Sequence, residues 1–188
     1  MKRILVYCGS AKGNDPTYQT SAIKLAQLLV EHNLGLVYGG GNVGLMGIIA
    51  DEVLRLGGEV IGVIPRRLME KEVGHANLTE MFIVEDMHQR KAKMFELSDA
   101  CIALAGGIGT MEELFEAFTW SQLGFHQKPC GVLNTKGYYN ALHQLMQHMV
   151  DSGFLKQQHK DQLIFETDEE RLLRKLLSAT NDFGDKWW

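Results

Sequence analysis

Short apolar runs alternate with amphipathic helical patterns along almost the whole chain, and this alternation restricts the possible folds more than any other feature. Seven runs are typical of buried parallel strands: 3–8, 34–39, 59–64, 81–86, 101–106, 129–134 and 162–167. Helical patterns cover 16–32, 44–56, 87–98, 110–123, 138–152 and 168–178. Only 65–80 is predicted to be a charged, irregular connection. The pattern therefore predicts an α/β fold, a doubly wound parallel sheet of about seven strands with helices on both faces.

Length and charge exclude several classes of protein. The 188 residues suffice for one domain, interpreted here as residues 1–180, with a short tail at 181–188. A net charge of −4 argues against a nucleic-acid partner, which needs a clustered basic surface. No run of about 18 apolar residues exists, so no membrane span is expected. The cysteines, Cys8, Cys101 and Cys130, lie apart without CxxC spacing, which indicates buried thiols in a reducing cytoplasm.

Ligands of such sheets bind beyond the carboxyl ends of the strands, so the turns there are the candidate sites. After the first predicted strand, the turn CGSAKGND contains Gly9, Ser10 and Gly13, which suit close approach to a ligand. The same residues equally suit a tight turn before a helix that starts at Asp15-Pro16. The residues alone do not separate these two interpretations.

A second glycine-rich turn, YGGGNVGLMG, matches the GxGxxG dinucleotide pattern at 39–44. The match is weak because it follows the second predicted strand rather than the first. In addition, Ile64 and Pro65 stand where a ribose-binding acid is expected. Arg66 and Arg67 could hold a 2′-phosphate, which keeps an NADP-binding oxidoreductase open as an alternative. The other interpretation is that these glycines let backbone segments approach closely.

A cluster of cations opens the helical pattern in EDMHQRKAKMFELSDA, where Arg90, Lys91 and Lys93 lie near the helix start. Cations at this end oppose the helix dipole by about 0.3–1 kcal/mol each when exposed. A sequence selected for stability alone would more often place acids there, which favours a functional role. Ion pairs with Glu85 or Asp86 are the structural alternative.

The stretch LAGGIGTMEELFEAF joins a glycine-rich turn to a helix and carries two adjacent acids in its first turns. Thr110 and Glu113 have the spacing of a capping box, in which both side chains bond end N–H groups. A capping box does not require Gly106, Gly107 and Gly109, however, and these glycines suit a loop that wraps an anion. A carboxylate beside a phosphate is unfavourable unless it faces another part of the ligand. A ribose would fit, and the stretch therefore indicates a nucleoside monophosphate.

At this level of detail the chain resembles the LOG family of cytokinin riboside 5′-monophosphate phosphoribohydrolases, formerly often labelled lysine decarboxylase-like. The resemblance rests first on MHQRKAKM and GGIGTMEE. It continues in order through YCGS, VYGGGNVGLMG, GVIPRRL, TWSQLGFHQKPCGVLN and YYNALH, and so spans nearly the whole chain. Each motif alone is modest, whereas the ordered set is highly specific.

The resemblance implies a Rossmann-like, nucleotide-binding homodimer that hydrolyses the N-glycosidic bond of AMP or N6-modified AMP to free base and ribose 5-phosphate. It implies no cofactor and no metal, and it assigns Arg90 and Glu113 as the catalytic pair. The implied substrate contacts are Glu72, Met87, Arg90, Lys91, Gly106, Gly107, Ile108, Gly109, Thr110, Met111, Glu112, Glu113 and Thr119. One departure is Ala105, which stands where the family loop has proline; alanine can adopt the same φ at a small entropic cost of about 0.4–1 kcal/mol.

Two other functions remain open at this stage. A nucleotide or molybdenum-cofactor carrier or sensor of the same fold would bind without turnover, although Arg90 and Glu113 favour the enzyme. The NADP-linked oxidoreductase is the second. The preference between plain and N6-prenylated adenine cannot be predicted from the sequence, because the apolar residues that set it come from several segments.

Overall fold

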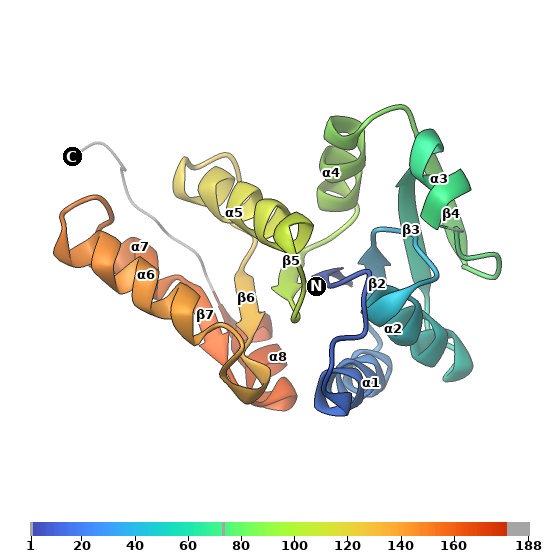
Figure 1. Ribbon diagram of the computed structural model, residues 1–188, viewed down its shortest axis with the longest axis horizontal. Helices are drawn as coiled ribbons and strands as arrows, with labels where there is room; N and C mark the ends of the chain where they lie inside the picture. The colour runs from blue at the N-terminus through green and yellow to red at the C-terminus, as the bar shows by residue number, and fades with distance from the viewer. Residues whose placement is uncertain (1, 73, 180–188) are drawn as a thin grey trace.

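The apolar runs form the strands of a single parallel sheet in the computed structural model, which describes residues 2–72 and 74–179 (Figure 1). Within this part of the chain the sheet has seven strands in the order β4-β3-β2-β1-β5-β6-β7. All neighbouring strands pair in parallel. The strands are β1 Arg3–Tyr7, β2 Gly35–Tyr38, β3 Val60–Pro65, β4 Glu80–Val84, β5 Ala100–Ala103, β6 Cys130–Leu133 and β7 Leu163–Glu166. The predicted parallel α/β sheet is therefore confirmed.

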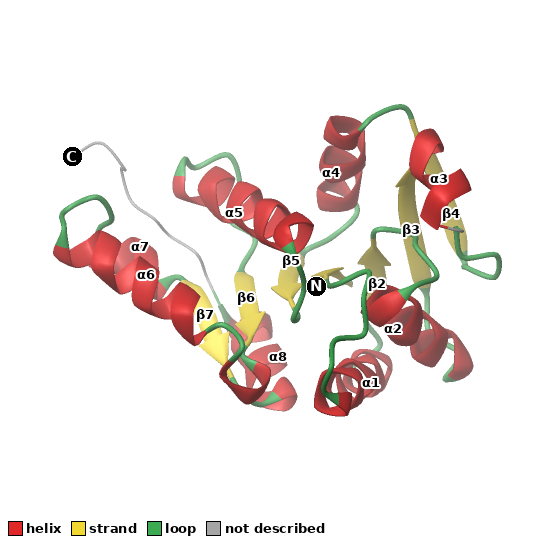
Figure 2. Ribbon diagram, viewed as in Figure 1, coloured by secondary structure: helices red, strands yellow, loops and turns green. Residues whose placement is uncertain are grey.

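Helices cover both faces of this sheet, as expected for a doubly wound fold (Figure 2). The helices are α1 Pro16–Glu31, α2 Gly44–Arg55, α3 Arg66–Glu72, α4 Met87–Glu96, α5 Ile108–Gln122, α6 Asn140–Asp151, α7 Gln157–Asp161 and α8 Glu169–Ser178, with a 3-10 turn η1 at Thr135–Gly137. Buried residues of α1, α2 and α8 form one core with the sheet, and those of α4, α5 and α6 form the other.

The central strand β1 explains why its sequence reads as a continuous apolar run. Ile4 and Val6 belong to one core, and Leu5 and Tyr7 belong to the other. Because successive side chains of a strand point to opposite faces, a strand with helices on both sides must be apolar at every position. For the same reason these strands show little alternation of apolar and polar residues. The length of the apolar run is therefore the better evidence for a strand in the sequence.

The structure corrects the interpretation of 65–80 as an irregular connection. Residues 66–72 form helix α3, which ends before β4 begins at Glu80. Its sequence, RRLMEKE, places charges on most positions, so no apolar stripe identifies it. The short helix α7 at 157–161 was also not predicted. The tail at 181–188 lies outside the described residues.

The order in which successive strands are added to the sheet reverses between β1 and β5. Strands β2, β3 and β4 lie on one side of β1, whereas β5, β6 and β7 lie on the other. The loops that follow β1 and β5 therefore separate at this point and leave a crevice at the carboxyl edge of the sheet. No helix in the described ranges is both long and apolar enough to cross a membrane.

Candidate active site

Two adjoining hollows occupy the crevice between β1 and β5. The first, called the acid compartment here, has a volume of about 230 Å³. Its lining residues are Cys8, Gly9, Ser10, Met46, Arg90, Gly107, Ile108, Gly109, Thr110 and Glu113.

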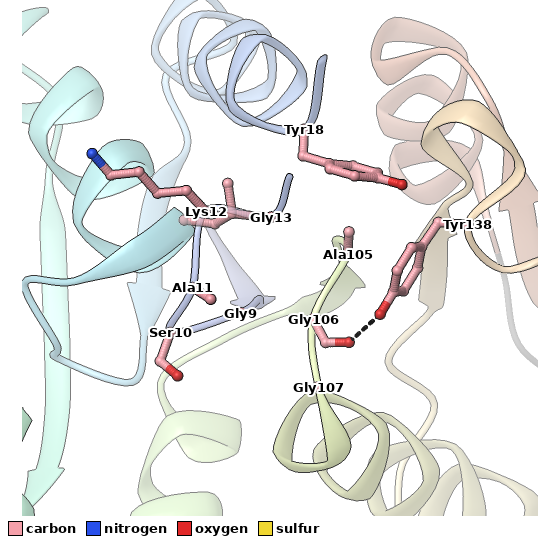
Figure 3. A pocket seen from close by; sticks show the side chains of 11 residues that line it. Gly9, Ser10, Ala11, Lys12, Gly13, Tyr18, Ala105, Gly106, Gly107 and Tyr138 are labelled. Atoms are coloured by element: carbon pink, nitrogen blue, oxygen red, sulfur yellow. Dashed lines mark hydrogen bonds between the residues drawn. The ribbon is translucent and has the colours of Figure 1, made fainter. Parts of the chain in front are cut away.

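The second hollow, called the tyrosine compartment here, has a volume of about 290 Å³. It is lined by Gly9, Ser10, Ala11, Lys12, Gly13, Tyr18, Leu45, Ala105, Gly106, Gly107 and Tyr138 (Figure 3). The two compartments share Gly9, Ser10 and Gly107, so they are neighbouring parts of one crevice.

The start of α5 supplies backbone donors to the acid compartment. Gly107 is the N-cap residue, and the first intrahelical bond is donated by the Met111 amide to the Gly107 carbonyl at 3.2 Å. The amides of 108–110 precede that bond and have no partner within the helix. A Cβ added at Gly107 or Gly109 would meet no atom within 4 Å, so neither glycine is required by the packing of the chain itself. Amides at the positive end of the helix dipole, beside open space, suit an anion.

The capping-box interpretation of Thr110 and Glu113 is wrong. The helix begins at Ile108 rather than at Thr110, and its N-cap residue makes no side-chain hydrogen bond. Thr110 is buried, and a Cβ at Gly106 would lie 2.1 Å from its Oγ1 atom. Gly106 is therefore a glycine because the Thr110 side chain occupies that space. Glu113 lines the acid compartment.

Arg90 brings a positive charge into the acid compartment from α4. Its Nε atom donates to the Val63 carbonyl at 3.1 Å, and Nη2 donates to the Gly39 carbonyl at 2.9 Å. The residue is only 6% exposed. Carbonyl oxygens accept hydrogen bonds without neutralising the charge, and a guanidinium stays protonated in proteins. The site therefore contains a fixed, buried cation held at the ends of β2 and β3.

Glu113 contributes the carboxylate of the compartment, close to the end of β1. Burial raises the pKa of the Cys8 thiol, and the Glu113 charge raises it further. Cys8 thus stays a neutral thiol at physiological pH and is a poor nucleophile. The reactive groups at this position are a carboxylate and a guanidinium on the walls of one cavity.

Lys91 and Glu112, both predicted to contact substrate, form an ion pair with each other. The Lys91 ammonium also lies 2.7 Å from Glu116, so it bridges α4 to two acids of α5. Burial disfavours the charge of Lys91, but these two acids outweigh it and raise the pKa of the ammonium. The ion pairs join the helix that carries Arg90 to the helix that carries Glu113.

The predicted alternative role of the cation cluster, ion pairs with Glu85 or Asp86, is also wrong. Asp86 caps α4 by accepting the Gln89 amide at 2.8 Å, and Glu85 lies 3.7 Å from Arg66. Lys93 pairs with Glu96, its neighbour on α4. Within the described ranges, neither acid therefore forms an ion pair with a cation of the cluster.

Several other predicted contacts do not line the acid compartment within one copy of the chain. Met87 lies beside Arg90, with 3.8 Å between its sulfur and Nη1. Met111 packs against the core, and Thr119 is exposed farther along α5. Glu72 belongs to α3, but its side chain lies outside the described structure. Of the predicted set, the acid compartment brings together Arg90, Gly107, Ile108, Gly109, Thr110 and Glu113, whereas Gly106 lines the tyrosine compartment.

The loop after β1 belongs to the site, and the site prediction did not include it. Gly9 and Ser10 line both compartments, and Cys8 and Met46 line the acid compartment. The turn that contains Gly9 and Ser10 was recognisable as a possible ligand contact. No signal in the sequence distinguishes Met46 from an ordinary core residue of a helix.

The glycines of the second turn make room for the chain's own atoms. A Cβ at Gly39 would lie 2.0 Å from Nη2 of Arg90, and a Cβ at Gly44 would lie 2.2 Å from the Ser10 carbonyl carbon. Gly44 also has a φ of +64°, which side chains rarely adopt. The close-approach interpretation accounts for both glycines. The structure therefore offers no separate reason to read this turn as an NADP site.

Replacing Gly44 by alanine is expected to lower the free energy of unfolding by about 2–5 kcal/mol, combining a left-handed alanine with a backbone clash. Gly57→Ala is the matched control, because Gly57 has a φ of +79° but an added Cβ meets nothing within 4 Å. The control should lose only about 1–2 kcal/mol. Urea unfolding of both variants measures the difference, and equal losses would show that the contact with Ser10 is unimportant.

Among the described residues, no group of three or more His, Cys, Asp or Glu side chains is arranged to hold a metal ion. The compartment instead combines unpaired helix amides, a buried guanidinium and a carboxylate at the switch point of a doubly wound sheet. These features are those of a Rossmann-like protein whose crevice suits a small anionic ligand.

Comparison with known proteins identifies the family. Residues 46–176 match the family model described as "Possible lysine decarboxylase". A cytokinin riboside 5′-monophosphate phosphoribohydrolase of Arabidopsis thaliana is 46% identical, over 98% of this chain and 85% of that protein. A probable phosphoribohydrolase of the same kind from Oryza sativa subsp. japonica is 50% identical, over 95% and 80%. The chain belongs to the LOG family.

More distant solved structures share the fold. The molybdenum cofactor binding protein from Rippkaea orientalis has a TM-score of 0.70 at 20% identity, over 95% of this chain and 97% of that one. The Moco carrier protein from Chlamydomonas reinhardtii has a TM-score of 0.67 at 19% identity, over 95% and 99%. At such low identity these similarities concern the fold alone.

Proposed function

We propose that the protein hydrolyses the N-glycosidic bond of a purine nucleoside 5′-monophosphate, AMP or an N6-modified AMP, to the free base and ribose 5-phosphate. The observation that carries this proposal is the placement of Arg90 and Glu113 on the walls of one compartment with the first amides of α5. The relatives named as cytokinin riboside 5′-monophosphate phosphoribohydrolases support the same reaction.

In the proposed complex, the amides of 108–110 bind the 5′-phosphate and Glu113 faces the ribose. Water adds to C1′ as the bond from C1′ to the base nitrogen breaks, and a proton passes to the departing base. Positive charge develops on the sugar during this step, and a nearby carboxylate stabilises it. Binding of the remote phosphate positions the reacting bond.

Arg90 has a different task in this mechanism. Because its guanidinium remains protonated, it is unsuited to act as a general acid. Its two carbonyl contacts fix the charge in place, so the cation is already oriented before substrate binds. Such a fixed cation offsets negative charge on the phosphate or on the departing base.

The test is product analysis after incubation of the purified protein with AMP, GMP, CMP and isopentenyl-AMP. Release of free base together with an equal amount of ribose 5-phosphate from the adenine nucleotides is the expected result. Binding of AMP without any release of base would contradict hydrolysis and favour a carrier or sensor. Turnover of CMP as fast as AMP would contradict the purine preference.

We also propose that the protein is a cytoplasmic homodimer. Three free cysteines, all buried, fit a reducing compartment. Thr119 is exposed and does not line the acid compartment of its own chain, and a dimer could bring it to the compartment of the second copy. Light scattering should give about twice the chain mass of 21.1 kDa, and a monomer mass would contradict the dimer.

A further inference from the structure

The loop that leads into α5 is held by three consecutive hydrogen bonds to its carbonyl oxygens. The Leu104 carbonyl accepts from the Tyr139 hydroxyl at 2.5 Å, and the Ala105 carbonyl accepts from the Gly9 amide at 3.0 Å. The Gly106 carbonyl accepts from the Tyr138 hydroxyl at 2.6 Å (Figure 3). All three carbonyls between the end of β5 and Gly107, the N-cap of α5, therefore accept a hydrogen bond from outside the loop.

The two tyrosines are themselves well fixed. Tyr139 is 2% exposed, and its amide donates to Asn134 at 2.7 Å. Its ring meets the Tyr138 ring edge-on with 4.9 Å between centroids. Tyr138 in turn meets Tyr18 of α1 edge-on at 5.7 Å. Both hydroxyls thus extend from packed aromatic rings, which restricts where the loop carbonyls can lie.

The protonation state of Tyr139 is suited to this role. Burial raises the pKa of its hydroxyl, so the group remains a donor throughout the physiological range. Tyr138 is half-exposed at the edge of the tyrosine compartment, and Figure 3 shows its hydroxyl directed at Gly106. Neither residue lines the acid compartment, and both donate to carbonyls of the loop that leads to its amides.

We propose that Tyr138 and Tyr139 are positioning residues, which fix the direction of the α5 amides that bind the 5′-phosphate. Consecutive glycines at 106 and 107 would otherwise leave the loop many backbone conformations. Hydroxyl bonds to the two carbonyls that flank Ala105 reduce that freedom before the ligand binds, which strengthens binding of the anion. This proposal rests on the proposed function, because it assumes that the amides of 108–110 bind the phosphate.

The test compares ribose 5-phosphate with adenine as ligands of Tyr138→Phe, using calorimetry. Loss of one hydroxyl bond is expected to raise the Kd of ribose 5-phosphate about 3–10-fold. The Kd of adenine should stay unchanged, because adenine carries no phosphate. Tyr139→Phe should likewise raise the Kd of ribose 5-phosphate and leave the Kd of adenine unchanged. If Tyr139→Phe does not fold, Tyr138→Phe decides the question, because its hydroxyl is at the surface.

Tyr38→Phe is the control for removing a hydroxyl from an aromatic ring. The Tyr38 hydroxyl is buried on β2 and has no hydrogen-bond partner among the described residues, so both Kd values should stay at the wild-type level. An unchanged Kd for ribose 5-phosphate in Tyr138→Phe, or an equal weakening of both ligands, would overturn the positioning role. Wild-type protein that fails to release adenine from AMP would instead refute the proposed function.

Discussion

Glu113→Gln is expected to bind AMP but to release adenine about 10²–10³ times more slowly than the wild type. Glutamine keeps the shape of the side chain and removes its charge. Positive charge develops on the ribose only as the glycosidic bond breaks, so the carboxylate acts mainly on the transition state. Removal of one such electrostatic group typically raises the barrier by about 3–4 kcal/mol. A base-release assay under single-turnover conditions measures this change apart from binding.

Glu116→Gln is the matched control, because it makes the same change one turn farther along α5. Glu116 pairs with Lys91 and does not line the acid compartment. Lys91 retains Glu112 as a partner in this variant, so the rate should stay within about threefold of wild type, as expected for loss of a single partly exposed ion pair. Equal rates for Glu113→Gln and the wild type would show that the carboxylate does not act on the reacting sugar.

Arg90→Lys is expected to lower kcat/KM by about 10²-fold or more although the charge is conserved. A lysine ammonium is a compact donor on a flexible stem, and it cannot reproduce the planar fork that holds the Val63 and Gly39 carbonyls together. The cation would therefore lose its fixed position. One buried carbonyl would also lose its donor, which should lower the free energy of unfolding by about 1–3 kcal/mol.

Arg55→Lys controls for the chemical change itself, because Arg55 is a surface residue paired with Glu52. The free energy of unfolding of the Arg55→Lys variant should differ from that of the wild type by less than about 0.5 kcal/mol, and its turnover should be unchanged. Urea unfolding and steady-state kinetics separate the two effects at Arg90. Wild-type turnover in a destabilised Arg90→Lys protein would mean that Arg90 acts only in the structure.

The fold could be predicted from the sequence because its strands are buried on both faces. β1 and β3 are apolar at nearly every position. Turns that contain glycine follow β1, β2 and β5 and mark where these strands end. Helix α3 lacked such a signal, because its charged sequence has no apolar stripe. The start of α5 was misplaced for a related reason: Gly109 and Thr110 are typical of loops and caps, yet both lie inside the helix.

The candidate site was predictable only in part. The motifs identified Arg90 and Glu113, and the structure places both in one compartment. The partners of Arg90 could not be predicted, because they are the backbone carbonyls of Val63 in β3 and of Gly39 just after β2, which lie far from Arg90 in the chain. The same limit applies to Lys91 and Glu112, whose residue types suit a substrate contact and an ion pair equally well. Distances between helices, rather than residue types, decide such cases.

A crystal structure of Glu113→Gln with AMP tests the central claim most directly. The account predicts the nucleotide in the acid compartment, with phosphate oxygens about 2.7–3.2 Å from the amides of 108–110 and the glutamine side chain at the ribose. An empty acid compartment beside a nucleotide bound elsewhere, or a phosphate far from the start of α5, would contradict it.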